Sequence, residues 1–471
     1  MTHSAQISRR KLISGVTAAS SLSLLPSWAS TSKRISANDK ANIAFIGIGS
    51  YGSVNLVELA SQNIVAVCDV DWRNRSQIPG KGAIASEIAE KYPQARRFDD
   101  WRVMLEKMDK SIDCVVVCTA DHTHAIAALT AMKMGKHVYC EKPLAHSIDD
   151  VRAMVASAHE HKKQATQTGI VGHASEDVRR IVEWVRDGAI GTVESIEVFQ
   201  TNSESGRRYQ TPYGEISHIN DSIVTPAEVK WDLWLGPAPA RPYNPMYLPL
   251  RWRNWIDFGT GILGDHGPHF LDPVVWALDL GHPESIDADT DADYDHQVSR
   301  QMFPRSSRVK YRFPAHGSRA AVPLTWYGYD TPPIPEGWKK DELFPNGGGI
   351  LHGSKGKIVY GPVYSSKPGT PKQVWLLPEE LDREYHRPAA TLPRPQSHWL
   401  EWIDAARSGK SASANWQYGG LITEICLLGN IAIAQRGTRL DFDPKAHRFT
   451  NSDTANKLFH RTNRQGWAQP V

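Results

Sequence analysis

Residues 42–52 read NIAFIGIGSYG, and this stretch decides the fold of the first part of the chain. Asn42 to Gly47 is a short apolar run that ends in glycine, which is typical of a buried parallel strand. The pattern G-x-G-x-x-G then runs through Gly47, Ile48, Gly49, Ser50, Tyr51 and Gly52. Between a strand and a helix, such glycines permit a tight turn and the close approach of a pyrophosphate to the helix N-terminus. The stretch therefore predicts a dinucleotide-binding site.

The residue that selects the dinucleotide is expected at the end of the next strand. Asn63 to Cys68 is a second apolar run, and Asp69 follows it, about 20 residues beyond the glycine loop. A carboxylate at that place hydrogen bonds to a ribose diol and repels a 2′-phosphate, which favours NAD over NADP. Arg73 and Arg75 lie nearby and weaken that preference, so NADP stays the less favoured alternative.

Strands and helices alternate from residue 42 to residue 161, which predicts an α/β domain with a doubly wound parallel sheet. Beyond residue 165 the pattern changes, and Val193 to Thr201 alternates like a half-exposed antiparallel strand. We therefore expect a second, α+β domain on a mostly antiparallel sheet. The predicted division is an export signal over 1–30, a nucleotide-binding domain over 31–164 and a substrate and oligomerisation domain over 165–471.

The composition excludes several classes of protein. Lys and Arg number 54 against 51 Asp and Glu, and the net charge of +3 is too balanced to indicate a nucleic-acid-binding protein. Hydrophobic residues make up 41% of the chain, which excludes wholesale disorder. No apolar run reaches the ~18 residues that span a bilayer, so we expect no stable membrane anchor. The five cysteines lack the spacing of a zinc site or of a disulfide framework.

The first thirty residues have the organisation of an export signal. Arg9 and Arg10 precede a modestly apolar stretch from Leu12 to Leu25, and the sequence Ser-Trp-Ala at 27–29 places small residues where a signal peptidase cuts. The stretch resembles the twin-arginine signal of bacteria, with an ordinary Sec signal as the alternative. Because the twin-arginine route carries folded proteins, it predicts a periplasmic or secreted protein that acquires its cofactor before export.

Two pairs of polar residues are candidates for acid–base chemistry. Glu141 and Lys142 follow the predicted strand His137 to Cys140, where groups at a carboxyl strand end face the ligand crevice. A lysine beside a glutamate, desolvated by a cofactor, can act as an acid or a base, whereas a surface ion pair is the alternative. Asp265 and His269 are four residues apart and share one helix face, although an N-capping Asp and a core His have the same spacing.

One further cluster is considered for a metal ion. Asp121-His122-Thr123-His124 places two histidines at i and i+2, but the sequence shows no third or fourth ligand beside them. A closed zinc site needs four donors, so we expect no metal here.

Together these motifs resemble the Gfo/Idh/MocA oxidoreductases, a family that includes glucose–fructose oxidoreductase and inositol dehydrogenase. The likeness is carried by the glycine loop, by Cys68-Asp69, by Thr119 to His124, by Glu141-Lys142-Pro143 and by Gly261 to Leu271. It covers residues 42 to about 280 well and the remainder loosely. It implies a Rossmann domain, followed by a domain whose large open sheet supports the active site and forms a homo-oligomer, either a dimer or a tetramer.

The resemblance also implies roles for individual residues. Lys142 corresponds to the catalytic proton donor or acceptor, and Asp265 and His269 correspond to contacts with sugar hydroxyls, His269 sharing the proton work. The implied cofactor contacts are Gly47, Ile48, Gly49, Ser50, Tyr51, Gly52, Asp69, Thr119, His122, His124, Glu141 and Lys142. The expected partner is a small sugar or glycoside.

A Pro- and Trp-rich loop from Thr211 to Asp257 departs from the cytoplasmic members of the family. It contains Trp231, Trp234, Trp252 and Trp255, whose rings either stack on a sugar or a subunit or form a buried cluster. The loop resembles a secreted branch, some of whose members are NAD-dependent glycosidases. A periplasm has no pool of free NAD, so an exported enzyme must recycle a bound cofactor. We therefore expect a sugar oxidoreductase, with such a glycosidase and a non-catalytic sugar-binding protein as alternatives.

Overall fold

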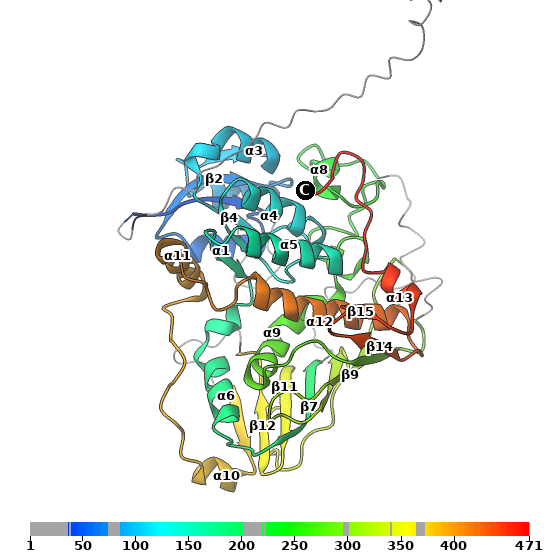
Figure 1. Ribbon diagram of the computed structural model, residues 1–471. Helices are drawn as coiled ribbons and strands as arrows, with labels where there is room; N and C mark the ends of the chain where they lie inside the picture. The colour runs from blue at the N-terminus through cyan, green and yellow to red at the C-terminus, as the bar shows by residue number, and fades with distance from the viewer. Residues whose placement is uncertain are drawn as a thin grey trace, which may run out of the picture.

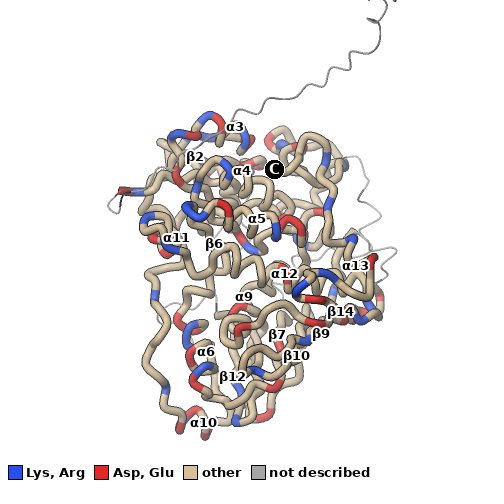
Figure 2. The backbone as a smooth tube through the Cα atoms, viewed as in Figure 1, with Lys and Arg blue, Asp and Glu red and all other residues tan. Residues whose placement is uncertain are grey.

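The computed structural model describes residues 36, 39–73, 85–201, 219, 223–294, 301–339, 342–363 and 373–470. The predicted export signal over 1–30 lies outside the described residues, as does Arg75. Two sheets, with helices between and beside them, make up the described part of the chain (Figure 1). Basic and acidic residues are interspersed over both parts in this view, in keeping with the small net charge (Figure 2).

The first sheet is parallel, and among the described residues it has six strands in the order β3-β2-β1-β4-β5-β6. The strands are Asn42–Ile46 (β1), Asn63–Cys68 (β2), Arg96–Phe98 (β3), Cys114–Val117 (β4), His137–Cys140 (β5) and Thr166–Thr168 (β6). The helices that alternate with them are Gly52–Glu58 (α1), Ala85–Glu90 (α2), Trp101–Met108 (α3), His124–Lys133 (α4) and Ile148–Glu160 (α5). The predicted doubly wound sheet is confirmed. Its strand order reverses between β1 and β4, where ligands bind outside the carboxyl ends of the strands.

The first sheet continues past the boundary that the sequence places at residue 164. Thr166–Thr168 pairs in parallel with β5, and Gln167 and Thr168 are fully buried. The strand reads Thr-Gln-Thr, so it lacks the apolar run by which the other central strands are recognised.

The second sheet is mostly antiparallel, and its order among the described residues is β13-β12-β11-β7-β10-β9-β8-β14-β15. Its strands are Val193–Gln200 (β7), Ser285–Thr290 (β8), Ser307–Phe313 (β9), Val322–Gly328 (β10), Gly347–Gly353 (β11), Gly356–Tyr360 (β12), Val374–Leu377 (β13), Leu440–Asp443 (β14) and Arg448–Phe449 (β15). The pair β7–β10 is parallel, and the other strand pairs of the sheet are antiparallel. The residues of strand β9 alternate strictly between buried and exposed, as expected for a sheet with one face against the core and the other toward solvent. The predicted second domain is confirmed.

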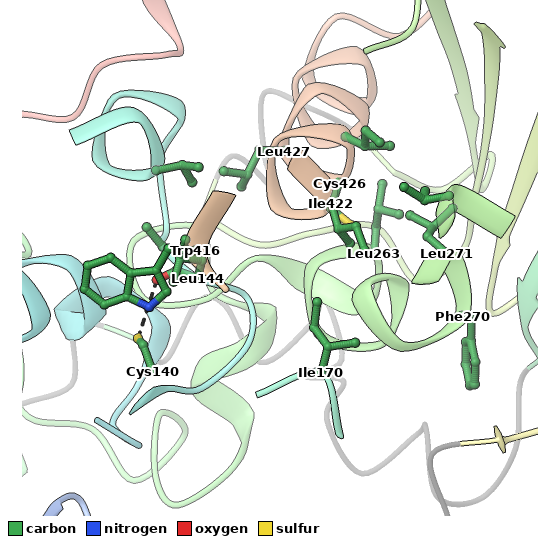
Figure 3. Close-up of a cluster of buried hydrophobic side chains, with 14 of the residues drawn as sticks. Cys140, Leu144, Ile170, Leu263, Phe270, Leu271, Trp416, Ile422, Cys426 and Leu427 are labelled. Carbon is green, nitrogen blue, oxygen red and sulfur yellow. Dashed lines mark hydrogen bonds between the residues drawn. The ribbon is translucent and has the colours of Figure 1, made fainter. Parts of the chain in front are cut away.

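Helices of the second part lie between the two sheets and beside them (Figure 1). They are Glu176–Arg186 (α6), Trp231–Leu235 (α8), Gly261–Leu278 (α9), Glu379–Glu384 (α10), His398–Ser408 (α11), Trp416–Ala434 (α12) and Asp453–Lys457 (α13). Leu263 of α9 lies beside Ile422 and Cys426 of α12 in the buried cluster of Figure 3. A Cβ atom on Gly267 would come within 2.9 Å of the Cys426 sulfur, so glycine permits the close approach of these two helices.

Helix α12 is long and apolar enough to cross a membrane by length and composition, which the search for apolar runs did not anticipate. In the structure 78% of its apolar window is buried within the protein. It lies against α5, α9 and the second sheet, as a core helix does.

Helix α11 returns to the first sheet, although the sequence assigns its residues to the second domain. Its side chains Trp402 and Ile403 are fully buried in one cluster with Ile43 and Phe45 of β1. Ser397 begins the helix by accepting a hydrogen bond from the Leu400 amide. The core beneath the glycine loop therefore includes residues from near the end of the chain.

The four tryptophans of the Trp-rich loop pack into one aromatic cluster, in which Trp231 is partly buried and the other three are buried. Trp255 is fully buried, Trp252 is 7% exposed, and the rings of Trp231 and Trp234 stack with centroids 4.9 Å apart. A ring that stacks on a sugar must be accessible, so Trp252 and Trp255 fit the structural alternative. Residues 202–218 of this region lie outside the described residues.

Candidate active site

The glycine loop between β1 and α1 has the shape that a dinucleotide requires. Gly47 has a φ of 84°, and a Cβ atom there would lie 2.4 Å from the Cys118 carbonyl oxygen. A Cβ atom on Gly52 would lie 2.2 Å from the Gly47 carbonyl oxygen. The Ser50 hydroxyl is buried and has no hydrogen-bond partner among the described residues. This hydroxyl can donate a hydrogen bond to a cofactor phosphate. The first turn of α1 contains no acidic residue that would repel the phosphate.

Asp69 lies at the end of β2 and organises the glycine loop. One carboxylate oxygen accepts hydrogen bonds from the amides of Ile48 (2.9 Å) and Gly49 (3.1 Å), and the other accepts from the amide of Asp71 (3.0 Å). Burial raises the pKa of Asp69, and these amides oppose that rise. The role in the loop is additional to the ribose contact that the sequence predicts, which stays a prediction.

Asp69→Ala is expected to weaken NAD binding by about 1.5–3 kcal/mol, because it removes a charge-assisted acceptor and leaves the two loop amides unpaired. Titration of cofactor-stripped protein with NAD, followed by calorimetry, measures the change. Asp69→Asn keeps one acceptor oxygen and should fall between the wild type and the alanine variant. An alanine variant that binds NAD within a factor of two of the wild type would contradict the assignment.

His122 and His124 point both ring nitrogens at backbone carbonyls. The nitrogens of His122 lie 3.2 Å and 3.0 Å from the carbonyl oxygens of Phe258 and Trp234, and those of His124 lie 2.8 Å and 3.2 Å from Pro143 and Thr119. Burial lowers the pKa of His122 to about 3 and that of His124 to about 4, and the hydrogen bonds to the carbonyl oxygens oppose that effect. The structure gives them a positioning role: His124 holds the segment that carries Lys142. Their cofactor contacts stay predictions.

Lys142 and Asp265 come from the two parts of the molecule and meet directly. The Lys142 ammonium, beyond the end of β5, donates to the Asp265 carboxylate at 2.6 Å and to the Asp265 carbonyl oxygen at 2.7 Å. The second carboxylate oxygen lies 3.2 Å from the Arg253 Nε and 3.7 Å from the His266 Nε2. The sequence predicted Lys142 and Asp265 separately, and the fold brings them together across 123 residues.

The charges in this cluster are fixed by its burial and its cations. Burial alone would raise the pKa of Asp265, but Lys142 and Arg253 hold that pKa well below its usual range. Burial and then the Lys142 charge keep the pKa of His269 well below its ordinary value. The cluster therefore presents an ionised carboxylate and a neutral imidazole beside a lysine, which are the parts that a proton transfer needs.

Glu141 is buried behind Lys142 and connects β5 to α1. Its carboxylate accepts a hydrogen bond from the Asn55 amide group at 3.0 Å, and Asn55 in turn accepts one from the Trp399 ring nitrogen at 2.8 Å. Burial raises the pKa of Glu141, and the neighbouring Lys142 opposes that rise. The Glu141 carboxylate also accepts a hydrogen bond from the Lys142 backbone amide at 3.3 Å, so it supports the backbone that carries Lys142; its predicted cofactor contact stays a prediction.

Asp121 and Arg253 belong to the site but were not predicted as parts of it. The Asp121 carboxylate accepts a hydrogen bond from the Thr260 hydroxyl at 2.7 Å, and burial raises its pKa to about 7, against the effect of Arg253. Asp121 was considered only for a metal ion, and Arg253 carries no motif in the Trp-rich loop. Asp121 follows the carboxyl end of β4, whereas nothing in the sequence places Arg253 in the site.

Asp121 is expected to make folding stability fall as pH rises from about 4 to about 7. The folded protein keeps a proton, with a pKa of about 7, that the unfolded chain releases near its ordinary value of 3.8, so the slope reaches at most about 1.4 kcal/mol per pH unit. Asp121→Asn should flatten this slope in urea unfolding measured at several pH values. Asp404 is exposed, so Asp404→Asn serves as the control and should leave the slope unchanged. Equal slopes in the wild type and Asp121→Asn would refute the assignment.

Comparison with known proteins agrees with this geometry. A family model described as "Oxidoreductase family, NAD-binding Rossmann fold" matches residues 41–169, and one described as "Oxidoreductase family, C-terminal alpha/beta domain" matches residues 174–319 and 350–469. Together they cover most of the chain.

Among curated proteins, "Glycosyl hydrolase family 109 protein 1" of Akkermansia muciniphila is 28% identical over 183 residues, 37% of this chain and 36% of that protein. Inositol 2-dehydrogenase of Salmonella paratyphi B is 26% identical over 172 residues, 36% of this chain and 48% of that protein. The chain thus spans about a third to a half of the length of these curated relatives.

Among solved structures, the WlbA dehydrogenase of Bordetella pertussis, in complex with NADH and UDP-GlcNAcA, has the same fold. Its TM-score is 0.56 at 16% identity, with 87% of this chain and 99% of that chain covered. Because the two family models match in order along the sequence and together cover most of it, the chain belongs to the Gfo/Idh/MocA oxidoreductase family. Its first domain is the NAD-binding Rossmann domain of that family.

Proposed function

We propose that this protein oxidises a hydroxyl group of a sugar or sugar derivative, with a tightly held NAD. The observation that carries the proposal is the contact of the Lys142 ammonium with the ionised Asp265 at the end of β5, with His269 four residues further along α9 and within reach of the Lys142 charge. NAD, when bound, supplies the hydride acceptor. The residues that would hold it are the glycine loop, with its Ser50 hydroxyl, and Asp69.

The remaining chemistry falls to the side chains of the site. Asp265 orients Lys142 through two hydrogen bonds, and it stays ionised because Lys142 and Arg253 flank it. The Lys142 ammonium can take the hydroxyl proton of the sugar only if it passes one of its own protons on, and the neutral imidazole of His269 would accept that proton. Arg253 and Asp265 also offer a donor and an acceptor to neighbouring hydroxyls.

A glycosidase that works by transient oxidation and elimination is the second candidate. The relative from Akkermansia muciniphila carries a glycosidase name, and the same three side chains would serve the cycle. Such a cycle would return the hydride to the sugar after water has replaced the eliminated group, so the net reaction would be hydrolysis and NAD would not be consumed. A chain with an export signal favours such internal recycling, because free NAD is absent outside the cytoplasm.

Absorbance of the purified protein at about 340 nm, before and after addition of sugars and aryl glycosides, separates the candidates. A lasting increase with a sugar supports net oxidation. Release of the aryl group without a lasting increase supports the glycosidase. If ligands bind but neither signal appears, the protein is a sugar-binding relative and the proposal fails. Lys142→Met is the control for adventitious activity.

We propose further that the protein is exported folded by the twin-arginine route, carries NAD from the cytoplasm and acts as a homo-oligomer. The basis is the sequence around Arg9 and Arg10, together with the glycine loop. Substitution of both arginines by lysine should retain the protein in the cytoplasm, whereas a Sec signal would tolerate it. Denaturation of the purified protein should release stoichiometric NAD, and light scattering should give a mass above that of one chain.

A further inference from the structure

Three side chains from distant segments converge at the side of the second sheet, away from the candidate active site. They are His282, in the loop before β8; Glu424, on α12; and His447, in the turn between β14 and β15. One ligand atom from each lies within 4.8 Å of the others, and the His282 Nε2 lies 2.9 Å from a Glu424 carboxylate oxygen. None of the three takes part in the chemistry proposed above.

The carboxylate of Glu424 is buried and oriented. Arg152 of α5 lies 3.3 Å from one carboxylate oxygen through its Nε, and it donates to the His447 carbonyl oxygen at 3.0 Å. The second carboxylate oxygen of Glu424 faces the Nε2 of His282. Arg152 therefore holds both the glutamate and the backbone of His447, while its charge opposes any cation placed beside them.

His447 occupies a backbone conformation that favours glycine. Its φ is 51°, and the turn is fixed because the Asp443 carboxylate accepts hydrogen bonds from the amides of Lys445 (2.8 Å) and Ala446 (3.1 Å). A non-glycine residue in the left-handed region is uncommon, and such outliers cluster at functional sites. The turn thus holds an exposed imidazole beside a buried carboxylate at a conformational cost.

We propose that His282, Glu424 and His447 bind a divalent transition-metal ion, with Zn²⁺ as the first candidate. Two imidazoles and one carboxylate are a donor set that zinc accepts, whereas Mg²⁺ and Ca²⁺ prefer oxygen ligands alone. Bonds of about 2.0–2.2 Å in a tetrahedron place ligand atoms about 3.3 Å apart. The exposed His447 side chain can close that difference by rotating, and water would take the fourth position.

An ion at this place would join the loop before β8, helix α12 and the turn before β15. Because His282 lies 142 residues before Glu424, and because the three ligands meet only in the folded chain, binding should stabilise the folded protein and raise its melting temperature. At a zinc concentration about 100 times the dissociation constant, the rise expected for a chain of this size is roughly 3 °C.

The test uses the tag-free, full-length, NAD-loaded protein after treatment with a chelator. Calorimetric titration with Zn²⁺ should give one site per chain, and Co²⁺ should give visible absorption typical of nitrogen and oxygen ligands. The decisive variant is His447→Gly, since glycine suits a φ of 51° and should fold at least as well as the wild type without zinc. It should lose zinc affinity by about 10-fold or more, together with the thermal shift.

Two further variants separate a metal site from a plain His–Glu hydrogen bond. Arg152→Met should tighten zinc binding, because it removes a cation from beside the ligands. His316→Ala removes an exposed histidine that lies 3.4 Å from Asp279, and it should leave zinc binding unchanged. Absence of a zinc-dependent thermal shift in the wild type, or the same zinc affinity in His447→Gly, would overturn the proposal.

Discussion

Lys142→Met is expected to lower kcat by about 10²–10⁴-fold, equivalent to about 3–5 kcal/mol of transition-state stabilisation, while NAD stays bound. The substitution keeps much of the side-chain volume but removes the ε-amino group, which is the only group of Lys142 that can transfer a proton. The glycine loop and Asp69 do not contact the Lys142 ammonium in the structure, so cofactor binding should survive. Steady-state kinetics, with release of NAD by denaturation as the binding measurement, provide the test.

Lys142→Arg is the matched control for this prediction. Arginine keeps the positive charge beside Asp265, and thus the ion pair, but it does not release a proton near neutral pH. A large loss in both variants attributes the effect to proton transfer, whereas rescue by arginine attributes it to charge alone. Near-normal turnover in Lys142→Met with bound NAD would remove the basis of the proposed chemistry.

His269→Ala should lower the rate to a similar extent if His269 and Lys142 form one proton path. The double variant should then lose much less than the product of the two single effects, because removal of either member already breaks the path. If the rate loss of the double variant equals the product of the two single losses, His269 serves substrate binding alone and is not part of the proton path.

The sequence predicts the elements of the first sheet where an apolar run marks the strand. Strand β6 escapes that analysis because it is polar, although it is fully buried between β5 and the C-terminal part of the chain. Helix α11 is recognisable from its own periodicity, but periodicity does not say which sheet a helix covers. Its packing on the first sheet depends on contacts between residues far apart in the chain, such as the ring of Trp402 against that of Tyr139 on β5.

The candidate site could be predicted only in part for a similar reason. Lys142 and Asp265 each follow a local pattern, but Arg253 and Asp121 enter the site through tertiary contacts that leave no trace in their neighbours. The role of Asp69 is also broader than its motif indicates, since its carboxylate holds the loop amides. A motif names the residue type at a place, whereas its hydrogen-bond partners are decided by the fold.

Asp265→Ala is expected to destabilise the folded protein by about 3 kcal/mol, because it leaves two partly buried cations without their carboxylate. Lys142 would keep only the carbonyl oxygen of residue 265 as an acceptor, and Arg253 would lose a partner at 3.2 Å. Urea unfolding at pH 7 measures the loss. Asp265→Asn keeps the shape and one acceptor oxygen without the charge, so its loss should be smaller.

The pH dependence of that loss separates a charge effect from a packing effect. The pKa of Asp265 in the folded protein lies well below its ordinary value of 3.8, so its contribution is fully present above that value and is lost as the pH falls toward the folded pKa. The difference between the wild type and Asp265→Asn should therefore be constant from pH 5 to pH 7 and should shrink below about pH 4. A difference that does not change with pH would mean that Asp265 stabilises the site by its shape, and that Lys142 is oriented by the carbonyl oxygen instead.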